Sequence, residues 1–207
     1  NQMSIEEIHV KNVYDAIASE FDETRYRPWS CVEGFLDNIP KGSVIGDIGC
    51  GNGKNMLYRN DCLNYGCDFS KNLVKISQKK NLNVILGDVL NIPYQTNIFD
   101  YTICIAVIHH LSTKEKRVKA IQELERVTKP HGKILILVWA LEQEKESKRK
   151  FTQQDNFVDW KDKKQNLLGK RYYYVFKENE LDSFIQKDKI VKSFYEKGNW
   201  GIIFKKE

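Results

Sequence analysis

Three glycines and one acidic residue lie where the first apolar run ends, in the segment Asp47-Ile48-Gly49-Cys50-Gly51-Asn52-Gly53. Glycine lets the backbone turn tightly and approach a ligand that a Cβ atom would exclude. A dinucleotide fingerprint G-x-G-x-x-G would need its third glycine where Lys54 stands, which argues against NAD. We therefore predict that Asp47, Gly49, Cys50, Gly51, Asn52 and Gly53 bind a different cofactor.

Two further carboxylates, Asp68 and Asp88, follow the next two apolar runs. In open parallel sheets ligands lie at the carboxyl ends of the strands, so the three acids would meet at one edge. A single strand-end Asp is more often a helix cap. Three of them with the glycine segment resemble the motifs of class I S-adenosylmethionine (SAM) methyltransferases. The resemblance implies that Asp68 binds both ribose hydroxyls, that Asp88 faces the adenine amino group, and that Val89 and Ala106 complete the site.

Short β-branched runs alternate with segments of helical spacing along the chain, which predicts an α/β fold with a parallel sheet. The resemblance to class I methyltransferases implies their Rossmann-like fold, a seven-stranded, mostly parallel sheet with helices on both faces. The predicted strands are 43–48, 65–68, 83–87, 101–106 and 133–139, and the predicted helices are 54–60, 71–79 and 114–128.

Segments at both ends of this pattern extend the predicted fold. Residues 1–42 should place helices over the cofactor site, and residues 141–171 form a charged insert. We expect all of them to belong to one domain, 1–207. The other predicted elements are a helix at 8–21, a helix around 178–186, and a C-terminal antiparallel hairpin of 190–195 and 200–204 that turns at Gly198-Asn199.

The end of the fourth predicted strand should show which chemistry the enzyme performs. Many enzymes that methylate nitrogen carry Asn/Asp-Pro-Pro-aromatic here, but this chain has Ile105-Ala106-Val107-Ile108-His109-His110. No Pro-Cys pair for attack on a pyrimidine ring stands there either. Adjacent residues do not share a face of a regular element, so we expect only one of His109 and His110 to point at a substrate, and the other to be structural.

Several segments resemble one family, the eukaryotic tRNA wobble-uridine carboxymethyl methyltransferases. The resemblance runs from about Val10 to Phe204 and is most specific in the segments Tyr14–Trp29, Asp47–Lys54, Ala106–Thr113, Trp139–Gln143 and Arg171–Tyr173. It implies an enzyme that esterifies 5-carboxymethyluridine in the tRNA anticodon loop, with SAM as cofactor and a small zinc-binding activator subunit as partner. Larger relatives carry a longer insert, and some animal relatives add an oxygenase domain.

This activity would explain why the sequence shows no general base. A carboxymethyl group has a pKa of about 4 and is already a nucleophile at neutral pH. The chain then supplies orientation and excludes water. We expect Arg25 to be a single polar clamp, with His109 or His110 as a neutral donor and Trp139 as a wall. The alternative is that Arg25 pairs with Asp22 or with the SAM carboxylate. Arg171, Tyr172 and Tyr173 are predicted to bind loop bases.

Composition narrows the class of protein further. The 207 residues include 33 Lys+Arg and 28 Asp+Glu, and residues 145–171 alone hold nine basic against four acidic residues. This segment is either a solvated loop or a surface for polyanions. Five cysteines without C-x-x-C spacing predict neither disulfides nor a metal site, and no run is long enough to span a membrane. We expect a protein of the cytoplasm, or of the nucleus as well.

Two other functions share parts of this pattern. A SAM methyltransferase of a small quinone- or sterol-like molecule would have the same cofactor motifs, but would not need the basic insert. A non-catalytic scaffold would not need intact cofactor acids. For the activator, the best candidate surface is the predicted edge strand 83–87, whose Asn-Val-Ile-Leu-Gly sequence is apolar and uncharged and invites strand pairing.

Overall fold

The computed structural model describes residues 2–207 and contains a seven-stranded sheet in the order β3-β2-β1-β4-β5-β9-β8. Strands β1 to β5 run parallel, and β9 and β8 add an antiparallel hairpin. This confirms the predicted fold class. The strands are β1 Val44–Ile48, β2 Leu63–Asp68, β3 Asn83–Leu86, β4 Phe99–Ile105, β5 Thr128–Trp139, β8 Ile190–Glu196 and β9 Asn199–Lys205.

Helices cover both faces of this sheet because its strands are apolar on both sides. Alternate side chains of β5 point to opposite faces. Ile136 packs with Leu124 of α4 (Lys114–Val127) in one core cluster, whereas Leu135 packs with Leu36 of α2 (Ser30–Asp37) in another. α3 (Lys71–Lys79) lies beside β3 and begins at Ser70, whose hydroxyl accepts the Leu73 N–H.

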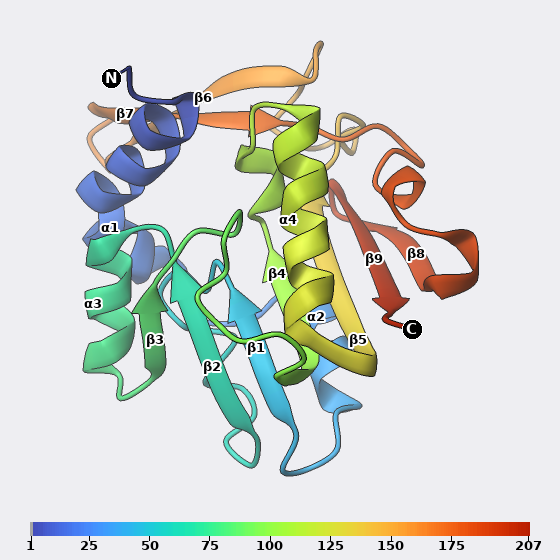
Figure 1. The fold of residues 1–207 in the computed structure, drawn as a ribbon. Helices are drawn as coiled ribbons and strands as arrows, with labels where there is room; N and C mark the ends of the chain where they lie inside the picture. Colours follow the sequence, from blue (N-terminus) through green and yellow to red (C-terminus); the bar gives the residue numbers. More distant parts are fainter. Residues whose placement is uncertain (1) are drawn as a thin grey trace.

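The N-terminal elements and a separate two-stranded sheet lie across the carboxyl ends of the parallel strands (Figure 1). A π-helical turn, η1 (Glu7–Lys11), leads into α1 (Asn12–Thr24). The small sheet pairs β6 (Asp155–Lys161) with β7 (Leu167–Tyr174). The edge that the sequence assigned to the cofactor is therefore covered from above by two groups of elements.

Two predicted helices are wrong. Residues 54–60 form consecutive turns, in keeping with their content of asparagines, which favour turns. Residues 178–186 form turns and a 3₁₀ turn, η3 (Asp182–Phe184), because Asn179 adopts a left-handed φ of 66° that interrupts a helix. A further 3₁₀ turn, η4 (Lys187–Lys189), leads into β8.

The C-terminal hairpin forms as predicted, but its turn lies one residue earlier. Lys197 and Gly198, with φ of 47° and 82°, are the central residues, as a turn between twisted strands requires. The charged insert also differs from a plain solvated loop, because β6 and much of β7 lie within it. Among residues 2–207, no helix has the length and apolar character needed to span a membrane.

Candidate functional site

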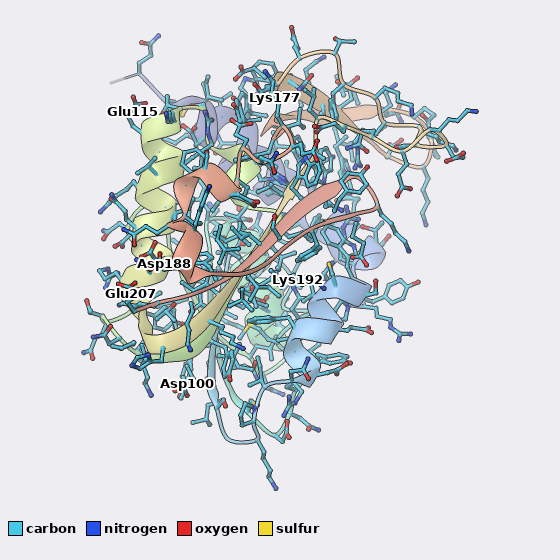
Figure 2. The ribbon with its side chains drawn as sticks, turned by 90° about the vertical axis from the view of Figure 1, so that its right-hand side faces the viewer. Asp100, Glu115, Lys177, Asp188, Lys192 and Glu207 are labelled. Atoms are coloured by element: carbon cyan, nitrogen blue, oxygen red, sulfur yellow. The ribbon has the colours of Figure 1, made fainter. Side chains whose placement is uncertain are left out.

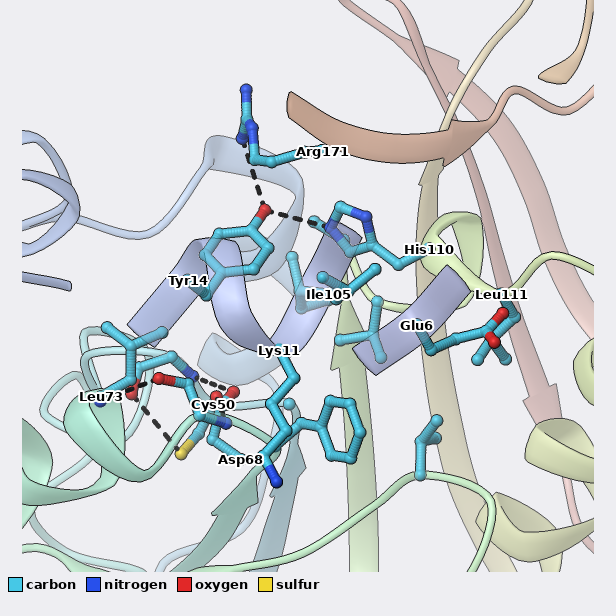
Figure 3. A pocket seen from close by; sticks show the side chains of 18 of the residues that line it. Glu6, Lys11, Tyr14, Cys50, Asp68, Leu73, Ile105, His110, Leu111 and Arg171 are labelled. Atoms are coloured by element: carbon cyan, nitrogen blue, oxygen red, sulfur yellow. Dashed lines mark hydrogen bonds between the residues drawn. The ribbon is translucent and has the colours of Figure 1, made fainter. Parts of the chain in front are cut away.

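A cavity of about 500 Å³ opens at the carboxyl ends of the parallel strands. η1, α1, the glycine loop, the ends of β4 and β5, and β7 all contribute to its walls (Figure 3). Of the predicted site residues, the lining includes Arg25, Gly49, Cys50, Gly51, Asn52, Asp68, Asp88, Val89, Ala106, His110, Trp139, Arg171 and Tyr173. Asp47, Gly53, His109 and Tyr172 lie behind this lining.

The glycine loop turns directly beneath the cavity. Gly49 has a φ of 77°, and a Cβ atom there would stand 2.2 Å from Val107 Cγ2. Gly51, with φ of 55°, would direct a Cβ toward the ring of Phe21 at 3.4 Å, into the space between the loop and α1. Gly53 serves the fold instead, since its Cβ would meet Leu82 at 2.3 Å. The loop therefore leaves room for a ligand at Gly51.

Asp68 holds the glycine loop and still faces the cavity. Its Oδ1 accepts the Gly51 N–H and its Oδ2 accepts the Ser70 N–H, each at 3.0 Å. Each carboxylate oxygen can accept a second hydrogen bond, so two ribose hydroxyls fit this side chain. Asp88 accepts the Leu90 N–H through Oδ1 at 2.9 Å. These are the acceptors that the adenosine part of SAM would need.

Asp47 is a buried acid without a partner. Its side chain is 2% exposed, and neither carboxylate oxygen has a hydrogen-bond partner within residues 2–207. Burial, and then the nearby Asp68 charge, raise its pKa to about 7. It lies behind the lining, directly before the glycine loop.

The pH dependence of SAM binding should report on Asp68. Burial raises the pKa of Asp68 to about 6, although the Ser70 and Gly51 N–H groups favour its charged form. A protonated carboxyl accepts ribose hydroxyls poorly, so affinity should be constant above neutral pH and fall about tenfold by pH 5. Calorimetry from pH 8 to pH 5 measures this. Asp68→Asn should remove the step and Asp47→Asn should keep it, whereas an unchanged affinity in the wild type would contradict it.

Arg25 reaches the cavity because α1 is tied to the glycine loop. The Asn52 side-chain amide donates to the Asp22 carboxylate at 2.9 Å and also to the Arg25 carbonyl. Lys80 pairs with the same Asp22 oxygen at 2.7 Å. Asp22 is thus engaged by Lys80 and Asn52, and among residues 2–207 the Arg25 side chain donates only to Thr24 Oγ1, at 2.6 Å. The alternative in which Arg25 pairs with Asp22 is therefore wrong.

His109 and His110 have different surroundings. His110 Nδ1 donates to the Tyr172 carbonyl at 2.7 Å, so its Nε2 accepts the Tyr14 hydroxyl at 3.0 Å. Burial lowers the pKa of His110 to about 3, which keeps the ring neutral. His109 is fully buried, and its Nδ1 accepts a hydrogen bond from the backbone N–H of Trp139 at 2.9 Å. Contrary to the predicted donor role, His110 has no free proton for a substrate and His109 does not reach the cavity.

Trp139 and Tyr173 form one aromatic stack beside the histidines. Their ring centroids are 3.7 Å apart and the planes differ by 5°. The Tyr173 ring also contacts His109 and His110, at 4.7 and 4.5 Å. Tyr173 is therefore a buried wall and has no open face for an RNA base. Tyr172 points away from the cavity, with its hydroxyl donating to Asp155, so its predicted contact with bases is not supported.

Several residues of the lining were not predicted from the sequence. Tyr14 links His110 to Arg171, whose Nη1 donates to the Tyr14 oxygen at 3.3 Å. Its helical spacing to Phe21 and Arg25 was a usable signal, because all three face the cavity. Arg149 lines the cavity from an irregular part of the insert, where no periodicity marks it. Within the described residues, no cluster of His, Cys, Asp and Glu is arranged to hold a metal ion.

Known proteins resemble this chain over its whole length. A protein-family model described as "Methyltransferase domain" matches residues 46–136. A tRNA (carboxymethyluridine(34)-5-O)-methyltransferase of Schizosaccharomyces pombe is 38% identical over 229 residues, which cover 99% of each chain. The alkbh8 protein of Xenopus tropicalis, which has the same enzyme name, is 35% identical over 98% of this chain, and the chain spans 41% of that relative's length.

Solved structures share the fold. A SAM-dependent methyltransferase from Aquifex aeolicus has a TM-score of 0.63 at 19% identity, covering 91% of this chain and 97% of its own. A methyltransferase in complex with the Haloferax volcanii Trm112 activator has a TM-score of 0.56 at 21% identity, covering 64% and 61%.

The strand order and the cavity at Asp68 and the glycine loop, together with these matches, define a SAM-dependent methyltransferase, which confirms the predicted class and cofactor. The similarity to the fission yeast protein extends over the full length of both chains. This chain belongs to the tRNA (carboxymethyluridine(34)-5-O)-methyltransferase family, as its sequence motifs predicted.

Proposed function

We propose that this chain methylates the carboxylate of 5-carboxymethyluridine at the wobble position of tRNA and produces 5-methoxycarbonylmethyluridine. The observation that carries the proposal is that a single cavity joins the cofactor loop to the guanidinium groups of Arg25 and Arg171, in a chain of this family. An anionic acceptor fits these cations. The protein is proposed to act in the cytoplasm or the nucleus, which the unpaired state of the five cysteines supports.

The reaction needs no general base from the protein. The substrate carboxylate, with a pKa of about 4, is the nucleophile at neutral pH. SAM, when bound, supplies an electrophilic methyl group. The residues of the chain bind and orient the carboxylate and exclude water. Arg25 holds the carboxylate, Trp139 and Tyr173 form the wall, and His110 positions Tyr14.

Radiolabelled SAM with tRNA from cells lacking this modification tests the proposal. The label should enter the RNA, and mild alkali should release it as methanol because the product is an ester. A label that is stable to alkali would indicate methylation of nitrogen, carbon or ribose and would overturn the proposal. Activity that survives RNase would indicate a small-molecule substrate, and absence of SAM binding would indicate a scaffold.

A small methyltransferase activator is the proposed partner, and β3 is its proposed docking strand. β3 is one edge of the sheet, and its Ile85 and Leu86 are 41% and 54% exposed. Val84 of the same strand is already in a core cluster with Val74. The Gln78 side chain also donates to the Val84 carbonyl at 2.9 Å. The partner would therefore bury mainly Ile85 and Leu86.

Substitutions at the two edges of the sheet should separate this interface from a general loss of stability. Leu86→Lys and Ile85→Lys, made separately, should each reduce co-purification with the activator about tenfold or more, because each buries a charge in an apolar contact. The control is Val191→Lys on β8, the opposite edge strand, where Val191 is 53% exposed. Equal co-purification of all three variants with the wild type would place the interface elsewhere.

A further inference from the structure

Arg149 ends a three-layer stack on the wall of the cavity. Its guanidinium carbon lies 3.5 Å from the centroid of the Trp139 ring, and Trp139 stacks on Tyr173 at 3.7 Å. The flat guanidinium is thus held in place by an aromatic face rather than by a carboxylate. Stacking fixes the plane of the guanidinium and leaves its N–H edge available for a ligand.

Three guanidinium groups share this cavity without a counterion. Among residues 2–207, none of Arg25, Arg149 and Arg171 forms an ion pair with Asp or Glu. Arg171 is 5% exposed, and its Nε has no hydrogen-bond partner in the described chain. Burial, together with repulsion from Arg171, lowers the pKa of both Arg25 and Arg149. Of the three, Arg171 is buried, Arg25 is half-buried and Arg149 is exposed. Neighbouring cations that repel one another favour an anionic ligand.

Arg149 is the most available of the three. Arg25 donates to Thr24 and Arg171 to Tyr14, whereas the side chain of Arg149 donates no hydrogen bond within the described residues. The guanidinium can therefore donate two hydrogen bonds to an anion without breaking an existing hydrogen bond. A single clamp at Arg25 was predicted from the sequence, but the structure brings a further guanidinium, that of Arg149, to the same cavity.

We infer that Arg149 is a specificity-determining residue that binds the substrate carboxylate and distinguishes it from the uncharged methyl ester product. This inference rests on the proposed function. Methylation converts the carboxylate oxygen into an ester and removes its negative charge, while the RNA phosphates keep theirs. The product then leaves the guanidinium groups without their anion, so its affinity falls. Arg149 thereby favours product release and rejects neutral analogues of the substrate.

Binding of matched RNAs tests the inference. Anticodon stem-loop RNAs carrying the carboxymethyl, methyl ester or carboxamide group are titrated into the chain with S-adenosylhomocysteine, which permits no turnover. The wild type should bind the carboxymethyl RNA about tenfold more tightly than either neutral RNA. Arg149→Gln should reduce this ratio to about threefold or less. Lys148→Gln removes the same charge from the neighbouring exposed residue and should weaken all three RNAs alike.

The outcomes separate this inference from the proposed function. A wild type that prefers the carboxymethyl RNA, with the preference lost only in Arg149→Gln, supports the role of Arg149. Equal binding of the three RNAs by the wild type, or an unchanged ratio in Arg149→Gln, overturns it while alkali-labile methylation still stands. If the wild type forms no alkali-labile ester on the carboxymethyl RNA, both proposals fail. Melting curves confirm that each variant is folded.

Discussion

The Asp68→Ala variant is expected to bind SAM about a hundredfold more weakly than the wild type. Two ribose hydroxyls would lose charge-assisted hydrogen bonds worth about 1.5 kcal/mol or more each. The loop would loosen as well, because the Gly51 and Ser70 N–H groups both donate to this carboxylate. Calorimetry with SAM, alongside melting of the ligand-free protein, measures both effects.

Asp100→Ala is the matched control for this substitution. Asp100 also lies in a strand of the sheet and accepts a backbone N–H, from Val44 at 2.8 Å. It stands at the other end of the strands, at the opposite end of the molecule from Lys177, which follows β7 (Figure 2). Its loss should lower stability without changing SAM affinity. If the two variants lose SAM affinity equally, Asp68 acts only through the fold.

The central sheet and the cofactor loop could be predicted because their signals are local. β-branched runs mark strands buried on both faces, and Gly49 and Gly51 stand where a side chain would meet Val107 or fill the space before Phe21. Strand-end position alone placed Asp68 and Asp88 in the lining. Asp47 shares the motif but lies behind the cavity, because it stands within β1, before the glycine loop that lines the cavity.

The rest of the site depends on contacts between distant segments. Tyr14 meets His110 and Arg171 only because α1 crosses the strand ends, and Arg149 reaches Trp139 from a segment without regular structure. β6 was not predicted because its burial pattern does not follow its apolar residues. The large apolar side chain of Phe157 lies on the exposed face of the strand and is 51% exposed. Period-two reasoning expects such a side chain inside. The distinction between His109 and His110 likewise required the partners of each ring.

The two histidines offer the second large effect, because each is the control for the other. His110 Nε2 accepts a hydrogen bond from the Tyr14 hydroxyl, and the Tyr14 oxygen accepts one from Arg171 Nη1. His109 Nδ1 instead accepts a hydrogen bond from the backbone N–H of Trp139, and its ring packs against Trp139 and Tyr173. His110 should therefore position the substrate side of the cavity, whereas His109 should support its wall.

His110→Ala should lower kcat about tenfold to a hundredfold and leave SAM affinity within about threefold, because it releases Tyr14 and Arg171 but not the cofactor residues. Tyr14→Phe should cause a similar loss, and the double variant should lose little more, since both act through one hydrogen-bonded chain.

His109→Ala should mainly lower the free energy of unfolding, by about 2–4 kcal/mol, through a cavity and an unpaired backbone N–H of Trp139. Burial holds the pKa of His110 at about 3, so turnover should show no histidine titration between about pH 6 and 8. Additive losses in the double variant, or a titration near the ordinary histidine pKa, would show that His110 does not act through Tyr14.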